Sequence, residues 1–165
     1  LQSWPTVWIW LVLSHLKVRP YLSVVPLPSA EHEHDVVLSR ASSGAPCLFI
    51  GGMPLPWQIA HMHAQGVRGV VNLCDEFDGY PHLYRNLDIE QCHLPTVDYC
   101  NVPAHVIARG VAFIQRKILC GESVYVHCKS GVGRCAMVLV SYLARHEMQL
   151  DIVKANVWAR GHRQQ

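Results

Sequence analysis

The sequence is poor in charge and lacks the cysteine spacing of common structural metal sites. Only 16% of its 165 residues are charged, whereas 50% are hydrophobic. This composition excludes a largely disordered chain, because so much apolar surface has to be buried on folding. The seven cysteines are odd in number and include no C-x-x-C pair. Neither a secreted disulfide framework nor a four-thiolate zinc site is therefore expected, and a reducing compartment is favoured.

Acidic residues are missing before Glu31, and positive charge is concentrated in the second part of the chain. Residues 1–100 carry five Lys and Arg against nine Asp and Glu, whereas residues 101–165 carry nine against three. We therefore expect anions to bind to the second part. The net charge of +2 gives no indication of a nucleic-acid partner.

The sequence also lacks an apolar run long enough to span a bilayer. Val7–Leu13 is the strongest early run, and it falls short of the roughly 20 residues required. Three tryptophans between residues 4 and 10 suit a segment, residues 4–16, that contacts a membrane surface, although docking of the same run on the core is an equal alternative. Because the first residue is Leu, we expect a fragment or a processed product.

Prolines and small polar residues between positions 20 and 46 predict a linker. The chain is thus divided into an apolar N-terminal segment with a Pro-rich linker, residues 1–45, and one compact domain, residues 46–165.

Within the compact domain, strand and helix patterns alternate. Expected strands cover residues 47–50, 67–74, 89–94 and 123–127. Expected helices cover residues 54–65, 102–118 and 134–146, the second of them capped by Asn101. Such alternation predicts an α/β fold with a mostly parallel central sheet flanked by helices.

The segment that carries chemistry is Cys128-Lys129-Ser130-Gly131-Val132-Gly133-Arg134, between the last expected strand and the last expected helix. Its two glycines allow successive backbone N–H groups to face inward at a helix N-terminus, which makes an anion cradle. A thiol at its start is expected to ionise, and the planar guanidinium at its end can hold two phosphate oxygens. These are the parts needed for phosphoryl transfer to sulfur.

Asp98 is the candidate acid for the leaving group. It follows the expected strand at 89–94, and the next helix and strand form a crossover that returns the chain parallel. The Asp98 loop and the Cys128 loop then leave the sheet at the same carboxyl edge, where α/β proteins bind ligands. A local turn cap is the simpler alternative role for Asp98.

The cysteine loop resembles the C-x5-R phosphate loop of the protein-tyrosine-phosphatase superfamily, and His127 matches its usual preceding residue. Residues 47–163 resemble, more narrowly, the mitochondrial dual-specificity-like phosphatases that act on phosphatidylglycerophosphate. The stretches that carry this likeness are Phe49–Pro54, Gly66–Leu73 and Leu94–Asp98.

The resemblance implies a dual-specificity-phosphatase-like fold and roles for individual residues. Cys128 would be the nucleophile that forms a phosphocysteine, and Arg134 would clamp the phosphate. Asp98 would protonate the departing oxygen and then activate water. The phosphate-binding loop would comprise Lys129, Ser130, Gly131, Val132, Gly133 and Arg134. No metal or cofactor is implied.

The resemblance further implies a phosphorylated lipid such as phosphatidylglycerophosphate as substrate, with phosphoprotein as the close alternative. It places the protein at a mitochondrial or other intracellular membrane surface, with the cytoplasm as the alternative. Because relatives continue into a further helix, the C-terminal helix is expected to be truncated at Gln165.

Two positions depart from the family pattern. Cys135 stands where the family has Ser or Thr, whose hydroxyl hydrogen-bonds the leaving thiolate, and a thiol is a weaker donor. This departure favours an alternative function as a catalytically weak phosphate-binding module at a membrane, and it also allows a disulfide with Cys128. Val132 replaces a basic residue of the lipid-acting relatives, which weakens the lipid assignment.

The acidic run after residue 74 has a simpler interpretation. Asp75, Glu76 and Asp78 lack the D-x-D order of an aspartyl phosphotransferase, so we expect a solvated loop. His127 is expected to satisfy backbone groups at the strand end rather than to transfer protons.

Overall fold

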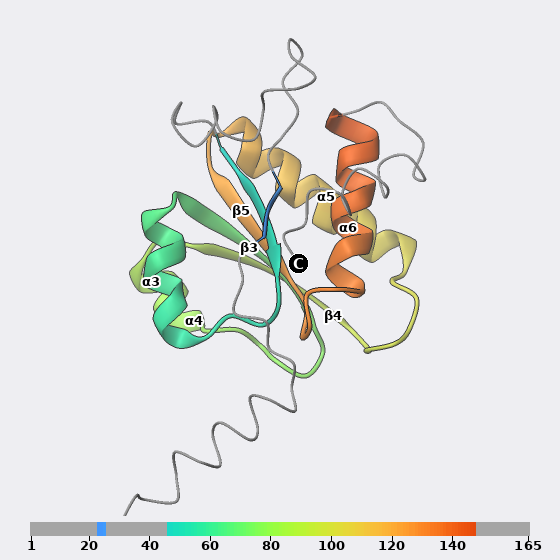
Figure 1. The fold of residues 1–165 in the computed structure, drawn as a ribbon, viewed down its shortest axis with the longest axis horizontal. Helices are drawn as coiled ribbons and strands as arrows, with labels where there is room; N and C mark the ends of the chain where they lie inside the picture. The colour runs from blue at the N-terminus through green and yellow to red at the C-terminus, as the bar shows by residue number, and fades with distance from the viewer. Residues whose placement is uncertain (1–22, 26–45, 148–165) are drawn as a thin grey trace, which may run out of the picture.

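The computed structural model describes residues 23–25 and 46–147, which form a five-stranded sheet with helices on both faces (Figure 1). The strands are β1 (Ser23–Val25), β2 (Leu48–Gly51), β3 (Val67–Cys74), β4 (Glu90–Thr96) and β5 (Ser123–His127), in the spatial order β1-β2-β5-β3-β4. Strands β2, β5, β3 and β4 are parallel, and β1 pairs antiparallel with β2. The predicted mostly parallel α/β sheet is confirmed.

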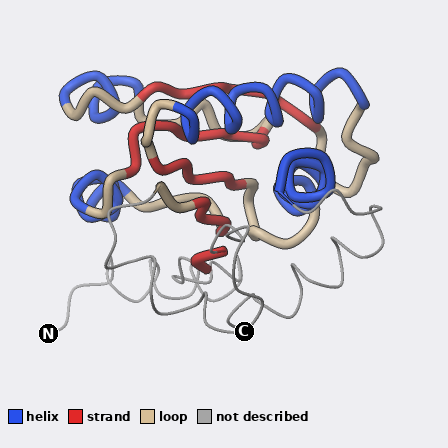
Figure 2. The backbone as a smooth tube through the Cα atoms, turned by 90° about the horizontal axis from the view of Figure 1, so that it is seen from above, coloured by secondary structure: helices blue, strands red, loops and turns tan. Residues whose placement is uncertain are grey.

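Helices cover the sheet from two sides. Helices α3 (Pro56–Ala64) and α4 (Pro81–Asn86) lie on one side, and α5 (Ala104–Leu119) and α6 (Arg134–Tyr142) lie on the other (Figure 1). Helix α6 continues into a π-helical segment, η1 (Leu143–Glu147). Figure 2 shows the strands running side by side between these helices.

Two apolar clusters separated by the sheet hold the layers together. Ile59 and Met62 of α3 belong to the same cluster as Tyr84 of α4. Ile114 of α5 and Leu139 of α6 belong to the larger cluster, on the opposite face of the sheet. Strand β5 is buried along its whole length. Because helices cover both faces of the sheet, consecutive residues of β3 and β5 are buried, with Arg68 of β3 alone half-buried. Each large buried aliphatic side chain contributes about 1.5–3 kcal/mol.

The structure differs from the sequence prediction at the sheet edges. Residues 23–25, assigned to the linker, add the antiparallel edge strand β1. Strand β4 continues through Pro95 to Thr96, past the predicted end at residue 94. Proline is accommodated because β4 is an edge strand and the β3–β4 register shifts between Asn72 and Cys74, a bulge at which Pro95 needs no ladder N–H.

Two helix predictions also need correction. Helix α4 has no counterpart in the sequence prediction, because its six residues are too few for a helical period to be read. Helix α5 begins at Ala104 after an extended Pro103, which makes no side-chain cap hydrogen bond, so the cap predicted at Asn101 is wrong. Pro103 has a fixed φ of −60°, suited to entering a helix.

The parallel pairing brings three strand ends to one edge of the sheet. Cys74 at the end of β3 pairs with Thr96 of β4, and Asn72 pairs with His127 of β5. The loops that follow these strands therefore begin side by side. Within residues 23–25 and 46–147, no helix has the length and hydropathy required to cross a bilayer. The expected membrane segment at residues 4–16 and the expected C-terminal truncation lie outside the described residues.

Candidate active site

The loop from Cys128 to Gly133 curls tightly between β5 and α6. Gly131 has φ +74°, and a Cβ at this position would collide with the backbone of Gly51 and Gly52. Only glycine suits such a left-handed conformation at such a close approach. The backbone N–H of Met53, the residue after Gly52, donates to Lys129 O at 3.1 Å. The segment that follows β2 thus packs directly against the loop and supports it.

Cys128 lies buried at the base of this loop. Its Sγ is 3.4 Å from Cys135 Sγ, and the backbone N–H groups of Cys135 and Gly131 also hydrogen-bond to it. These contacts, chiefly the one with the Cys135 side chain, lower the pKa of Cys128 to about 5 despite burial, and the Arg134 charge acts in the same direction. At neutral pH the residue is therefore a thiolate.

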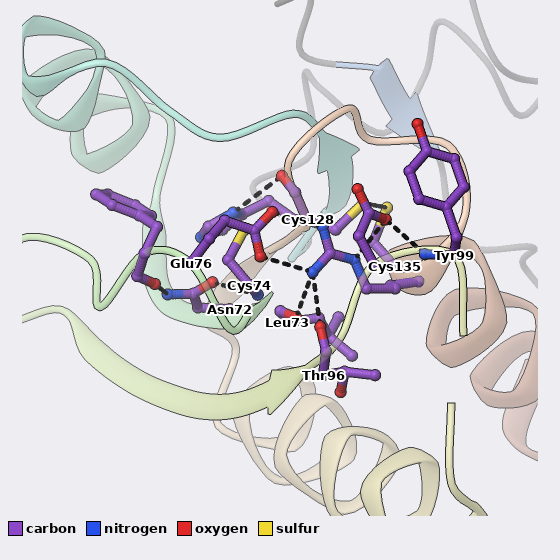
Figure 3. A network of polar contacts seen from close by, with 12 residues as sticks. Asn72, Leu73, Cys74, Glu76, Thr96, Tyr99, Cys128 and Cys135 are labelled. Carbon is purple, nitrogen blue, oxygen red and sulfur yellow. Dashed lines mark hydrogen bonds and ion pairs between the residues drawn. The ribbon is translucent and has the colours of Figure 1, made fainter. Parts of the chain in front are cut away.

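The Arg134 guanidinium is buried and surrounded by acceptors from strands β3 and β4 and from the loop that follows β3. Its Nη1 donates to Leu73 O at 3.3 Å and to Thr96 O at 2.7 Å. Nη1 and Nη2 also donate to the two Glu76 carboxylate oxygens, each at 2.9 Å. Figure 3 shows Glu76, Leu73 and Thr96 converging on this group. The strands β3 and β4 therefore fix the direction of the arginine.

Asp75, Glu76 and Asp78 are exposed, as predicted for a solvated loop, but Glu76 also makes an ion pair that the sequence did not indicate. The carboxylate makes a bidentate ion pair with Arg134, whose hydrogen bonds lower the pKa of Glu76 to about 2. The sequence did not indicate this pair because the partner lies 58 positions away. The sequence nevertheless held a signal for this pair. Glu76 lies two residues after the parallel strand β3, at the carboxyl ends of the strands, where Arg134 also lies.

Asn72 is a second residue that the sequence analysis missed. It is fully buried, its Nδ2 donates to Phe77 O at 2.7 Å, and its Oδ1 accepts from Cys74 N–H at 2.9 Å. These two bonds close the loop that carries Glu76. Asn72 therefore positions the carboxylate that holds the arginine.

Asp98 lies beside Arg134, as predicted from the crossover connection between the strand before Asp98 and the strand before Cys128. Its Oδ1 is 3.2 Å from Arg134 Nε and accepts from Tyr99 N–H at 3.1 Å. The Asp98 side chain remains 38% exposed. Within the described part of the chain, Arg134 Nε has this ion-pair contact but no acceptor in hydrogen-bond geometry. Nε is thus the guanidinium nitrogen that is best placed to hydrogen-bond a ligand.

The remaining loop residues form the rim of the site. Lys129 and Ser130 are half-buried, Gly131 is buried, and Val132 and Gly133 are exposed. His127, fully buried and stacked on Tyr125, has a pKa lowered to about 4 by burial, so its imidazole is neutral. Its Nδ1 lies 3.4 Å from Cys128 O, consistent with the expected role at the strand end. Among residues 23–25 and 46–147, no three His, Cys, Asp or Glu side chains are grouped as metal ligands.

Alkylation of Cys128 is expected to follow an ionisation near pH 5, because the thiolate is the reactive form and its fraction rises with pH. Cys135→Ala should raise the midpoint by about one to two pH units, since a hydrogen bond to a charged group contributes about 1.5–3 kcal/mol. Cys135→Ser keeps a donor and should shift it much less. Mass spectrometry of iodoacetamide adducts gives the rate at this residue.

The matched control is Cys120→Ser, an exposed thiol at the end of α5, which should leave the Cys128 midpoint unchanged. A midpoint near the ordinary cysteine value of about 8.5 in the unaltered chain would contradict the site electrostatics.

Replacing Glu76 by Gln is expected to lower the free energy of unfolding by about 1–2 kcal/mol at neutral pH, because the charge-assisted pair with Arg134 is lost. The pKa of Glu76 is lowered in the folded state, so its contribution is present above the ordinary Glu value and disappears as pH falls toward about 2. Urea denaturation at several pH values should show the difference between the two proteins shrinking below about pH 4.

The control for this prediction is Asp75→Asn, the same chemical change at the exposed neighbouring carboxylate. It should alter stability by less than about 0.5 kcal/mol. An equal loss in both variants, or a Glu76→Gln loss that does not depend on pH, would show that the pair does not stabilise the fold.

Comparison with known proteins agrees with this geometry. Residues 51–148, more than half of the chain, match the family model described as "Polymorphic toxin system, DSP-PTPase phosphatase". Phosphatidylglycerophosphate phosphatase PTPMT2 of Arabidopsis thaliana is 34% identical over 103 residues, which are 61% of this chain and 45% of that protein. Phosphatidylglycerophosphatase and protein-tyrosine phosphatase 1 of Homo sapiens is 30% identical over 105 residues, 59% of this chain and 52% of that protein.

Among solved structures, PTPMT1 in complex with PI(5)P superposes with a TM-score of 0.64 at 25% identity, covering 74% of this chain and 83% of that one. A point variant of human DUSP28 superposes with a TM-score of 0.60 at 26% identity, covering 73% of this chain and 80% of that one. The chain spans between about a third and a half of the length of the curated relatives that it matches. Taken with the cysteine loop, the family match shows that the chain belongs to the DSP-PTPase phosphatase family.

Proposed function

We propose that the protein hydrolyses phosphomonoesters through a phosphocysteine intermediate on Cys128. The observation that carries this proposal is the buried thiolate held by inward-facing N–H groups, in a loop that ends at Arg134. A phosphate ester seated in the loop places its phosphorus above the sulfur. The thiolate attacks phosphorus, and the bond from phosphorus to the ester oxygen breaks.

Asp98 supplies the proton for the leaving oxygen in this mechanism. A phosphate oxygen hydrogen-bonds Arg134 Nε and takes over the contact that Asp98 makes there. Once displaced, the Asp98 carboxylate takes up a proton from solvent and passes it to the leaving oxygen. The carboxylate that remains then accepts a proton from the water that attacks the phosphocysteine. The sulfur–phosphorus bond breaks, and the Cys135 thiol stabilises the departing thiolate.

Glu76 has a positioning role. Because it holds both Nη atoms of Arg134, it leaves Nε and one side of the guanidinium for substrate. A buried arginine with this pairing keeps its orientation before substrate arrives, which reduces reorganisation in the transition state.

The favoured substrate is a lipid phosphate presented at a membrane surface. The names of the curated relatives include phosphatidylglycerophosphate phosphatase, and one of the similar solved structures is PTPMT1 in complex with PI(5)P. In this chain, Val97 and Tyr99 flank Asp98, Val132 lies in the cysteine loop, and all three are exposed. We call these three residues the apolar rim. An apolar rim suits a phosphate whose ester carries acyl chains.

Tyr99 gives the apolar rim a further feature. Its φ is +60°, an uncommon conformation for a bulky residue, and Figure 3 shows its ring pointing away from the arginine network. Such a conformation costs about 1–3 kcal/mol and persists only where surrounding structure maintains it. A fully exposed aromatic ring beside the acid loop supports contact with the substrate or its membrane.

Phosphoprotein is the second substrate class, since the human relative's name joins both activities. Val132, in place of a basic residue, removes a charge that would favour an anionic lipid head group. A different kind of function, phosphate binding with little turnover, is favoured by the Cys135 thiol, because a weak donor slows breakdown of the phosphocysteine.

The activity is tested with p-nitrophenyl phosphate and with an alkyl phosphate. Cys128→Ser is expected to abolish turnover of both. Asp98→Asn should lower kcat by about 10²-fold or more on the alkyl ester and less on the aryl ester, whose better leaving group depends less on protonation. Asp78→Asn, an exposed carboxylate after β3, is the control and should change neither rate appreciably.

A burst of phosphocysteine without steady turnover would instead support the phosphate-binding function. In that case Cys135→Ser should restore the second step. Turnover that survives Cys128→Ser would refute both functions.

The apolar rim is tested by comparing one head group in two physical states. The double variant Val97→Ser, Tyr99→Ser should reduce hydrolysis of phosphatidylglycerophosphate in phosphatidylcholine vesicles by about tenfold, since inserting these two side chains would contribute at least about 1.4 kcal/mol. Hydrolysis of a soluble short-chain analogue should fall far less, so the readout is the ratio of the two rates.

Trp57→Ser, which removes another exposed apolar side chain, on α3, is the control and should leave the ratio unchanged. An equal fall in both states would remove the rim from substrate binding. A preference for phosphopeptide over both lipid forms would favour a protein substrate.

A further inference from the structure

We propose that the hydroxyl groups of Tyr125 and Tyr80 are positioning groups of the cysteine loop, and that they act through the segment that follows β2. The Tyr125 hydroxyl donates to Gly52 O at 2.5 Å, and the Tyr80 hydroxyl donates to Pro54 O at 3.1 Å. These two carbonyls lie on either side of Met53, whose N–H supports the loop. The role rests on the proposed function in one respect, namely that the loop binds a phosphate.

The peptide unit between Gly52 and Met53 connects Tyr125 to the cysteine loop. Its carbonyl oxygen accepts from the Tyr125 hydroxyl, and its N–H donates to Lys129 O at 3.1 Å. The C=O and N–H of a trans peptide point in opposite directions, so the two hydrogen bonds fix one plane from both sides. Rotation of this plane would break both bonds together. Because the plane follows a glycine, whose backbone rotates with little steric resistance, it needs a partner to hold it.

The sequence leaves room for Tyr125 beside this segment. A Cβ at Gly51 would collide with the Tyr125 hydroxyl, so glycine at position 51 lets the phenol reach the next carbonyl. Tyr125 is only 4% exposed, and Gly52 is also buried. A buried carbonyl that loses its donor is strongly disfavoured, because water cannot replace the hydrogen bond there. The Tyr125 hydroxyl therefore specifies the direction of the Gly52 carbonyl.

A row of four aromatic rings joins the two hydroxyls. Tyr125 stacks on His127 with ring centroids 5.6 Å apart. The Phe77 ring lies 6.2 Å from His127 and meets Tyr80 edge to face at 5.0 Å. The row thus runs from β5 to the loop that follows β3. It connects the support of the cysteine loop with the loop whose carboxylate pairs with the arginine.

Both tyrosines remain hydrogen-bond donors at neutral pH. Burial raises the pKa of the Tyr80 and Tyr125 phenols, so each keeps the proton that it donates.

The consequence for the loop is a fixed direction of its backbone. Lys129 O faces Met53, so the N–H of Ser130, which belongs to the same peptide unit as Lys129 O, points away from Met53. In the proposed role this arrangement is set before an oxyanion arrives. Loss of either hydroxyl lets the free protein adopt other arrangements, and binding then has to restore the productive one, which lowers affinity.

The test measures oxyanion binding to the full chain as protection of Cys128 from iodoacetamide by orthovanadate, read by mass spectrometry. Tyr125→Phe removes only the hydroxyl and should weaken vanadate binding by about fivefold or more, since a buried hydrogen bond is lost. Tyr80→Phe should weaken it by about two- to threefold, because Tyr80 is half-buried and water can replace part of its hydrogen bond. The alkylation rate without vanadate is measured for each variant, so that a change in thiol reactivity is separated from a change in affinity.

The matched control is Tyr84→Phe. The Tyr84 ring centroid is 6.3 Å from that of Tyr80 and the side chain is buried, but within the described part of the chain its hydroxyl has no hydrogen-bond partner. Its removal should leave vanadate binding unchanged. An equal fall in Tyr84→Phe, or no fall in either of the other two variants, would overturn the proposal. Urea denaturation establishes that each variant is folded, and if Tyr125→Phe is not, Tyr80→Phe against Tyr84→Phe decides in the same way.

Binding and turnover are read separately. The expected order of vanadate affinities without turnover of p-nitrophenyl phosphate would defeat only the proposed hydrolysis. Equal protection by vanadate in the unaltered chain and all three variants would defeat only the role of the hydroxyls. Vanadate that does not protect Cys128 in the unaltered chain would refute both.

Discussion

A single buried positive charge, the Arg134 guanidinium, joins the ends of the parallel strands. Removing a charge from water is costly unless partners replace its hydration, and here two backbone carbonyls and two carboxylates do so. The carbonyls belong to β3 and β4, and the carboxylates belong to the loops that follow these two strands in the sequence. The arginine is thus part of the sheet edge as well as part of the site.

The site at this edge depends on balanced charges. Glu76 pairs with both Nη atoms of Arg134, and the Cys128 sulfur lies among inward-facing N–H groups that favour its ionised form. Asp98 contacts the remaining edge of the guanidinium, so an incoming phosphate competes with it for the same donor. This competition links substrate binding to the release of the proposed acid.

Cys135 gives the site a property that the fold does not require. In the reduced protein its thiol stabilises the Cys128 thiolate, which makes the nucleophile available at neutral pH. Activation of the nucleophile therefore depends on a residue at which this chain departs from the family pattern.

The sequence by itself determined the features that depend on neighbouring residues. The strand, the glycine loop and the helix around Cys128 are continuous in the chain, so their pattern specified the phosphate loop, and the alternation of elements specified the parallel sheet. Only the tertiary structure decided that Glu76 pairs with Arg134 and that Asn72 holds the loop that carries Glu76. It likewise decided that β4 continues past Pro95 through a bulge, and that Cys135 Sγ contacts Cys128 Sγ. These outcomes depend on register and side-chain direction between segments far apart in sequence, and local propensity carries no information about such distances.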